Sequence, residues 1–213
     1  MCIRLTSTTI FSVVLAGIGQ PLLAAGGMTA SQIFQKSQQA YDAVHTFDQT
    51  AHSSVNGKNG GSAHIQFQRP GKLRVGGATM FNSSNYDLLS NGTTWLYNTG
   101  NWETVKDAET GIASITGISG SSGTAVPALL LHTRWGSPFP LSGNDTATVG
   151  AENISGHSTY RISTTAPLAT TFWIDKKTFF LVKMKQTFQT YTFVVTYNTP
   201  AVNKPIPPKA FTK

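Results

Sequence analysis

The segments AHIQFQRPGKLRV (Ala63–Val75) and YDLLSNGTTWLYN (Tyr86–Asn98) decide the fold class of this chain. In both, apolar and polar residues alternate, and each is interrupted by a turn, at Pro-Gly (residues 70–71) and at Asn-Gly (residues 91–92). Alternation with a period of two is typical of strands with one buried face, and Asn-Gly is a strong hairpin signal. The two segments therefore predict consecutive hairpins of an antiparallel sheet, with a basic corner at the first turn.

The residues on either side of these hairpins extend the prediction. From Thr29 to Phe47, apolar residues recur at spacings near three and four, which predicts an amphipathic helix with Thr29 or Ser31 as its cap. Strand patterns return between Thr159 and Tyr197, and the proline-rich tail at residues 200–208 cannot continue a sheet. The chain is thus predicted to be mainly β.

The middle of the chain follows a different pattern. Gly111 to Ala125 is rich in Gly, Ser and Thr and shows no strong periodicity, whereas Val126 to Trp135 predicts a short helix. Long loops inside compact domains are often functional or mobile. Two interpretations of the first segment stay open, a flexible insertion and a lid.

The first residues predict export. Met1–Arg4 is a short basic start, Ile10–Ile18 is apolar, and residues 23–27 supply small side chains for cleavage. The apolar run has about nine residues, and a membrane-spanning helix needs roughly twenty. We therefore expect a signal peptide at residues 1–25 and a single domain at residues 26–213. A periplasmic location is expected, or secretion where no outer membrane exists, and the mature chain would lack cysteine, because the only one is Cys2.

Composition limits the classes of partner. Charged residues make up 12% of the 213 residues and the formal net charge is +7, which could attract anionic membrane surfaces, acidic partners or nucleic acid. The lysines and arginines are dispersed, and an exported protein seldom meets nucleic acid. We therefore expect a solvated basic surface, no nucleic-acid partner and a monomer.

Catalytic and metal sites are not predicted. The five histidines lack the spacing of zinc ligands, and the serines at residues 119–122 do not form a G-x-S-x-G nucleophile elbow. The nine acidic residues make no recognisable catalytic pair. We therefore predict no enzyme, no cofactor and no metal.

Three motifs in order carry a family resemblance. Arg69-Pro70-Gly71-Lys72-Leu73-Arg74 resembles an RP-x-x-x-R corner, Asn91 to Tyr97 resembles a G-x-x-x-W-x-Y hairpin, and Phe172-Trp173-Ile174-Asp175 resembles a late W-I-D strand end. Together with the leading helix and the closing NKPIPPKAF, they resemble the LolA/LolB-like lipoprotein carrier superfamily, and most closely its uncharacterised exported members.

The resemblance implies a fold and a function. The implied fold is α+β, a strongly curved antiparallel sheet that forms an incomplete barrel, with the N-terminal helix and short helices or a loop over its concave side. The implied function is binding of lipid or lipoprotein acyl chains, as a carrier or chaperone, with Arg69 holding a helical lid closed. The partner would be a lipid or a lipidated protein.

Residues of the alternating strands are the candidates to line such a hollow. They are Ile65, Phe67, Leu73, Val75, Trp95, Tyr97 and Phe172. Each could equally belong to an ordinary filled core. Two further functions stay open, an envelope sensor or protein-interaction module that uses the same sheet, and a purely structural domain.

Overall fold

The computed structural model describes residues 27–78, 85–119, 121–139, 147–165 and 168–213. The helices are α1 (Ala30–Asp42), α2 (Ala108–Ser119), α3 (Ala125–Leu131) and a short 3-10 helix, η1 (Pro208–Phe211). The strands are β1 (Thr46–Val55), β2 (Lys58–Gln68), β3 (Lys72–Ala78), β4 (Asn85–Asn91), β5 (Trp95–Asn98), β6 (Trp102–Val105), β7 (Thr148–Ile154), β8 (His157–Thr164), β9 (Ala169–Asp175), β10 (Leu181–Phe188), β11 (Tyr191–Tyr197) and β12 (Ala201–Val202). The predicted signal peptide lies outside the described residues.

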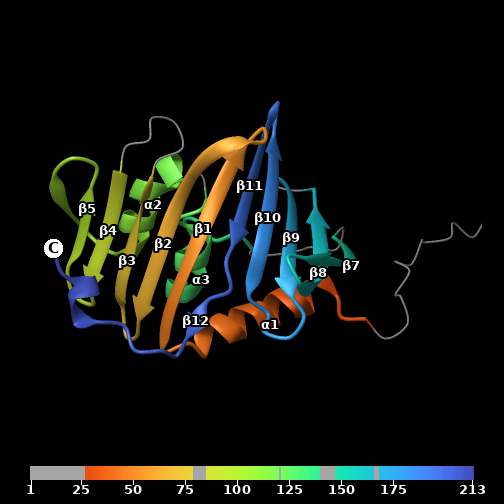
Figure 1. Ribbon diagram of the computed structural model, residues 1–213, viewed down its shortest axis with the longest axis horizontal. Helices are drawn as coiled ribbons and strands as arrows, with labels where there is room; N and C mark the ends of the chain where they lie inside the picture. Colours follow the sequence, from red (N-terminus) through yellow and green to blue (C-terminus); the bar gives the residue numbers. More distant parts are fainter. Residues whose placement is uncertain (1–26, 79–84, 120, 140–146, 166–167) are drawn as a thin grey trace, which may run out of the picture.

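One 12-stranded antiparallel sheet organises the molecule. Its order is β6-β5-β4-β3-β2-β1-β11-β10-β9-β8-β7, and β12 pairs with β1 beside this path. Because β6 and β7 are both free ends of the path, the sheet is open rather than a closed barrel (Figure 1). The predicted mainly β fold with an open, curved sheet is confirmed.

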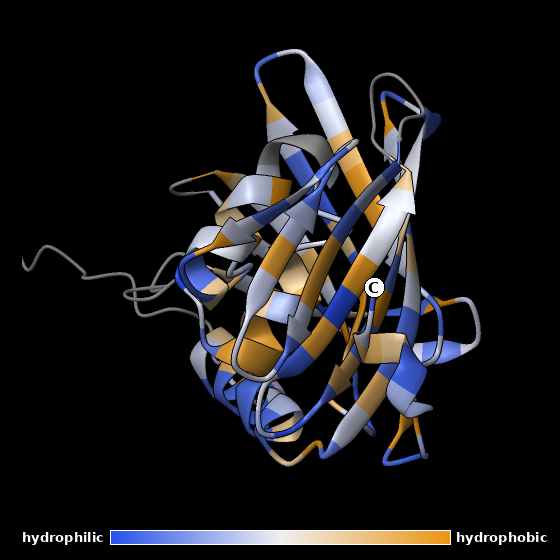
Figure 2. Ribbon diagram, turned by 90° about the vertical axis from the view of Figure 1, so that its left-hand side faces the viewer, coloured by the Kyte–Doolittle hydropathy of each residue, from blue (hydrophilic) through white to orange (hydrophobic). Residues whose placement is uncertain are grey.

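The three α-helices lie together on one face of the sheet (Figure 1). Orange and blue bands alternate along the strands in Figure 2, as expected for strands with one buried face. The buried cluster contains apolar residues of α1, α2 and α3 together with inward residues of the strands. The hydrophobic core therefore lies between the helices and the sheet.

The first helix is shorter than the sequence pattern predicts. Thr29 caps it as expected, because its hydroxyl accepts from Gln32 N and the Gln32 side chain accepts from Thr29 N. The helix ends at Asp42, and Phe47 already belongs to β1. Phe47 keeps the apolar spacing because it returns to the same core, fully buried beside Tyr41.

The glycine-rich middle is a helix, so the absence of regular structure predicted for residues 111–125 is wrong over most of that segment. Ile112 and Ile115 of α2 are fully buried, and the carboxylate of Asp107 accepts from Thr110 N at the start of the helix. Gly111 faces Leu88, and a Cβ at this glycine would lie 2.9 Å from Leu88 Cδ1. Small residues thus bring α2 close to the sheet, although they weaken the apolar periodicity.

Candidate functional site

The residues predicted to line a hollow all belong to, or pack against, the core under the helices. Ile65, Phe67, Leu73, Val75 and Phe172 are at most 1% exposed. The two aromatic residues of β5, Trp95 and Tyr97, are half-buried and pack against the same cluster. These seven residues therefore share the helix-covered face.

Helix α2 occupies the space over Trp95. A Cβ at Gly111 would lie 3.3 Å from Trp95 Cε3, which is closer than ordinary van der Waals contact. Across the sheet, Phe67 is 1% exposed inside the core. In this conformation, Phe67 and Trp95 are both packed against other side chains.

Arg69 contacts the C-terminal end of α1. Its Nε donates to the carbonyl oxygen of Val44 at 2.7 Å, and its terminal Nη2 donates to that of Tyr41 at 3.2 Å. Tyr41 lies in the last turn of α1, where carbonyls lack intrahelical donors, and Val44 lies just beyond the helix. Arg69 thus joins the β2–β3 turn to the end of α1, and its predicted role as a lid latch would act on this helix.

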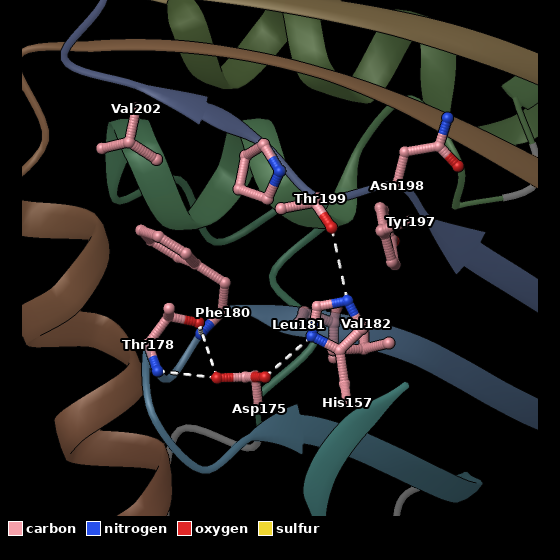
Figure 3. A pocket seen from close by; sticks show the side chains of 11 residues that line it. His157, Asp175, Thr178, Phe180, Leu181, Val182, Tyr197, Asn198, Thr199 and Val202 are labelled. Carbon is pink, nitrogen blue, oxygen red and sulfur yellow. Dashed lines mark hydrogen bonds and ion pairs between the residues drawn. The ribbon is translucent and has the colours of Figure 1, made fainter. Parts of the chain in front are cut away.

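A pocket opens where the sheet divides. Strand β11 pairs with both β1 and β10, but beyond Tyr197 the chain leaves β10 and forms β12 on β1. The resulting gap holds a cavity of about 210 Å³ (Figure 3). It is lined by His157, Asp175, Thr178, Phe180, Leu181, Val182, Tyr197, Asn198, Thr199, Pro200 and Val202.

The pocket has an apolar floor and a polar rim. Leu181, Val182 and Tyr197 are buried, whereas Asn198 and Thr199 are exposed. Burial raises the pKa of the Tyr197 phenol well above its ordinary value, and the neighbouring Tyr41 raises it further. The Tyr197 hydroxyl is buried and has no hydrogen-bond partner among the described residues. An apolar ligand with one polar group matches this arrangement.

A chain of hydrogen bonds crosses the rim of the pocket (Figure 3). His157 Nδ1 lies 2.8 Å from Asp175 Oδ2, and His157 Nε2 lies 3.3 Å from the Thr199 hydroxyl. In the neutral tautomer that donates from Nδ1, Nε2 accepts from Thr199. The chain ties the β11–β12 connection to β8 and β9.

Asp175 is the centre of this rim. Its other oxygen, Oδ1, accepts from Lys177 N, Thr178 N and the Thr178 hydroxyl. Burial raises the pKa of Asp175, but the hydrogen bonds from Thr178, His157 and Lys177 outweigh burial and lower it below its ordinary value. Asp175 is therefore an ionised anchor at neutral pH.

The Asp-His-Thr order resembles that of a nucleophile with its base. The Thr199–His157 distance of 3.3 Å is longer than the roughly 2.6–3.2 Å of an activated nucleophile. Pro200 follows Thr199 and has no N–H that could stabilise an oxyanion. The geometry favours a connection that holds the rim together.

Sequence reasoning missed this pocket. The Asp175-Lys176-Lys177 turn is readable from sequence, but only strand pairing brings His157 to Asp175, and only the departure of the chain after Tyr197 brings Thr199. Among the described residues, no group of three or more His, Cys, Asp or Glu is placed to hold a metal ion. None of the described helices is long and apolar enough to cross a membrane.

Comparisons with solved structures identify the fold. The lipoprotein LppX of Mycobacterium tuberculosis matches 83% of this chain and 96% of its own, with 16% identity and a TM-score of 0.52. MucB matches 88% of this chain and 64% of its own, with 10% identity and a TM-score of 0.52. The chain has the LolA-like fold. The resemblance read from its motifs is thereby confirmed at the level of the fold.

A LolA superfamily protein from Nitrosomonas europaea matches 88% of this chain and 99% of its own, with 10% identity and a TM-score of 0.33. MucB has also been solved in complex with MucA. No family model and no curated protein matches the sequence. Identities this low establish the fold and leave function to the site itself.

Proposed function

We propose that this protein binds a hydrophobic ligand, an acyl chain of a lipid or of a lipidated protein, in the cell envelope and without chemical change to it. The pocket at the division of the sheet carries this proposal. It links the exposed rim at Thr199 to buried apolar side chains such as Leu181. Ligand pockets of this kind are concave and mostly apolar, with a few polar groups that fix orientation.

The size of the pocket limits what it holds as it stands. A volume of about 210 Å³ is smaller than that of pockets for drug-sized molecules, which is about 300–1,000 Å³. It would accept one end of a chain. A longer ligand would have to extend beneath the helices, toward the seven strand residues that include Phe67 and Trp95.

Of the helices that cover the sheet, α2 is the one that a ligand would displace most easily. Its buried large residues with described side chains are Ile112 and Ile115, whose exposure would cost roughly 3–6 kcal/mol. Ten methylenes transferred from water to an apolar site gain about 8 kcal/mol. Binding of a medium-length acyl chain can therefore offset displacement of this helix.

Acyl-probe binding tests the proposal. A fluorescent dodecanoate analogue should bind the purified protein at micromolar concentration, and Val202→Trp, which fills the half-buried rim of the pocket, should weaken binding at least tenfold. Val149→Trp, at an exposed position of β7, is the matched control and should bind as the parent does. If the probe fails to bind and no lipid copurifies with protein from its own envelope, acyl binding is wrong. The protein-interaction module is then favoured.

Photo-crosslinking locates the ligand. A diazirine-labelled fatty acid should attach to peptides around Val182 and Val202 if the chain end occupies the pocket. Attachment around Trp95 and Tyr97 would instead place the ligand beneath α2. Peptide mass spectrometry reads the two outcomes separately.

Export is part of the same proposal. The basic start, the apolar run and the small residues before residue 26 support cleavage by a signal peptidase. N-terminal sequencing of the protein recovered from the periplasmic fraction should begin near residue 26. Recovery of the intact N-terminus from the cytoplasmic fraction would contradict export.

A further inference from the structure

Two hairpin turns lie side by side at one end of the sheet. The β10–β11 turn at residues 189–190 projects beyond the β1–β2 turn at residues 56–57 (Figure 1). Asn56 N donates to the carbonyl oxygen of Thr192 at 2.8 Å, and Thr192 N donates to Asn56 Oδ1 at 2.7 Å. These two bonds join the hairpins into one protruding tip.

Aromatic side chains gather at this tip. Phe188 is 53% exposed and Tyr191 is 49% exposed, and the two are directly paired across β10 and β11. The ring of Tyr191 lies 6.2 Å from that of Phe193, which pairs with Val55 of β1. We call these four residues the tip strip.

The tip strip continues the helix-covered face of the sheet. Phe188 lies four residues from buried Met184, and Tyr191 lies four residues from buried Val195, so strand alternation places all of them on one face. Nearby, the Ser121 hydroxyl, between α2 and α3, contacts Gln186 Oε1 at 3.3 Å. The strip thus adjoins the α2–α3 connection.

The charge around the tip strip has one sign. Lys58 pairs with Val55, and the exposed Lys185 precedes Phe188 on β10. Residues 49–69 and 183–197, which include the strand segments at this tip, contain no acidic residue. A partner of this surface should therefore be anionic.

We propose that the tip strip docks onto the surface of a bilayer that contains anionic lipid. Exposed aromatic rings favour the boundary between headgroups and acyl chains, and lysines near a membrane are attracted to anionic headgroups. A narrow protruding strip suits shallow insertion into an interface. This surface is distinct from the pocket and goes beyond the proposed function, because it provides a place where the protein would meet the membrane.

Vesicle sedimentation tests the docking surface. The parent protein should bind phosphatidylcholine vesicles that contain about 30% phosphatidylglycerol, more strongly than pure phosphatidylcholine vesicles, at low salt where screening is weak. Phe188→Ser with Tyr191→Ser should reduce vesicle binding at least tenfold, and Lys58→Gln with Lys185→Gln should reduce its salt dependence. Trp135→Ser is the control, because Trp135 is 59% exposed but contacts Glu109 near the start of α2.

The proposal is overturned if the aromatic double variant binds anionic vesicles as the parent does, or if both vesicle types bind equally. Circular dichroism should show that all variants stay folded. The acyl-probe assay in vesicle-free solution should be unchanged by the aromatic substitutions. If the aromatic double variant loses vesicle binding but still binds the acyl probe, the docking surface is supported. If the parent protein itself does not bind the acyl probe, only the proposed function is contradicted.

Discussion

The rim of the pocket depends on one carboxylate. Asp175 accepts four hydrogen bonds from three residues and is only 7% exposed. Its neighbouring turn is readable from the sequence, because Asp followed by Lys-Lys-Thr ends a strand pattern. Its partner His157 is not, because 18 residues separate the two and only strand pairing brings them together.

Asp175→Asn should destabilise the protein by about 2 kcal/mol at pH 7, because hydrogen bonds to a charged acceptor are stronger than those to a neutral one. The pKa of Asp175 is lowered in the folded state, so its stabilising contribution is complete above the unfolded value, near 3.9. That contribution is lost as the pH falls through the folded pKa. Urea unfolding between about pH 7 and pH 2 should show the decline in the parent and a smaller decline in the variant. Parallel pH profiles would contradict this role.

Arg69 requires a different expectation from the one its sequence motif implies. A pure lid latch would alter ligand exchange with little effect on stability. The side chain here donates to Val44 and Tyr41, so Arg69→Leu should lower the free energy of unfolding by roughly 1–3 kcal/mol.

The control is Arg161→Leu. Arg161 is half exposed and lies 3.5 Å from Glu152, so its loss should cost less than about 1 kcal/mol. Urea unfolding measures both variants. Equal stability of the Arg69 variant and the parent would show that these contacts contribute little.

At the scale of elements, strands are more readable than the helices that cover them. The alternation in β2 and β3 places Ile65, Phe67, Leu73 and Val75 on one face, as the structure has them. Helix α2 is difficult to predict from the sequence, because glycine, serine and threonine occupy positions where longer apolar residues would show a helical periodicity. Close tertiary contact stabilises α2, and this contact cannot be read from a single sequence.

Gly123, between α2 and α3, is packed so closely that a larger side chain would disturb this contact. A Cβ there would lie 2.5 Å from the Tyr86 hydroxyl and 3.2 Å from Val75 Cγ1. Gly123→Ala should therefore destabilise the protein by about 1–3 kcal/mol through overpacking.

Gly150→Ala is the matched control, because its nearest contact would be an ordinary 3.9 Å. It should change the free energy of unfolding by less than about 1 kcal/mol. Thermal unfolding compares the two alanine variants. If Gly123→Ala and Gly150→Ala have the same melting temperature, the α2–α3 connection is packed less tightly than the structure indicates.

At the scale of the whole molecule, the C-terminal tail braces the sheet. After β12 it runs to β3 and β4, where η1 places Phe211 in a buried position, 4% exposed (Figure 1). Arg74 Nη1 donates to the carbonyl oxygen of Ala210 at 3.4 Å, and the Lys72 ammonium lies 6.0 Å from the centre of the Phe211 ring. The proline pattern predicts that residues 200–208 do not continue the sheet, which is wrong for Ala201 and Val202, because these two residues pair with β1 as β12 before the tail leaves the sheet. Where it docks depends on distant residues.

Phe211→Ala should lower the free energy of unfolding by about 3 kcal/mol, because it removes a buried aromatic side chain. Lys209→Ala, at an exposed position of the same segment, should change it by less than about 0.5 kcal/mol. Urea unfolding measures both variants. If the unfolding free energy depends on urea concentration with the same slope in both, the difference between them is one of stability alone. A Phe211 variant as stable as the parent would show that the tail adds no support.

The division of the sheet after Tyr197 has a mechanical consequence. Strand β11 alone is paired to both halves, to β1 over residues 51–55 and to β10 over residues 183–188. At the other end, the halves are joined by the segment at residues 198–202 and by the packing of Phe47 on Phe180. Strand β11 is therefore positioned as a hinge between the two halves of the sheet. The His157–Thr199 contact holds the halves together at the opposite end.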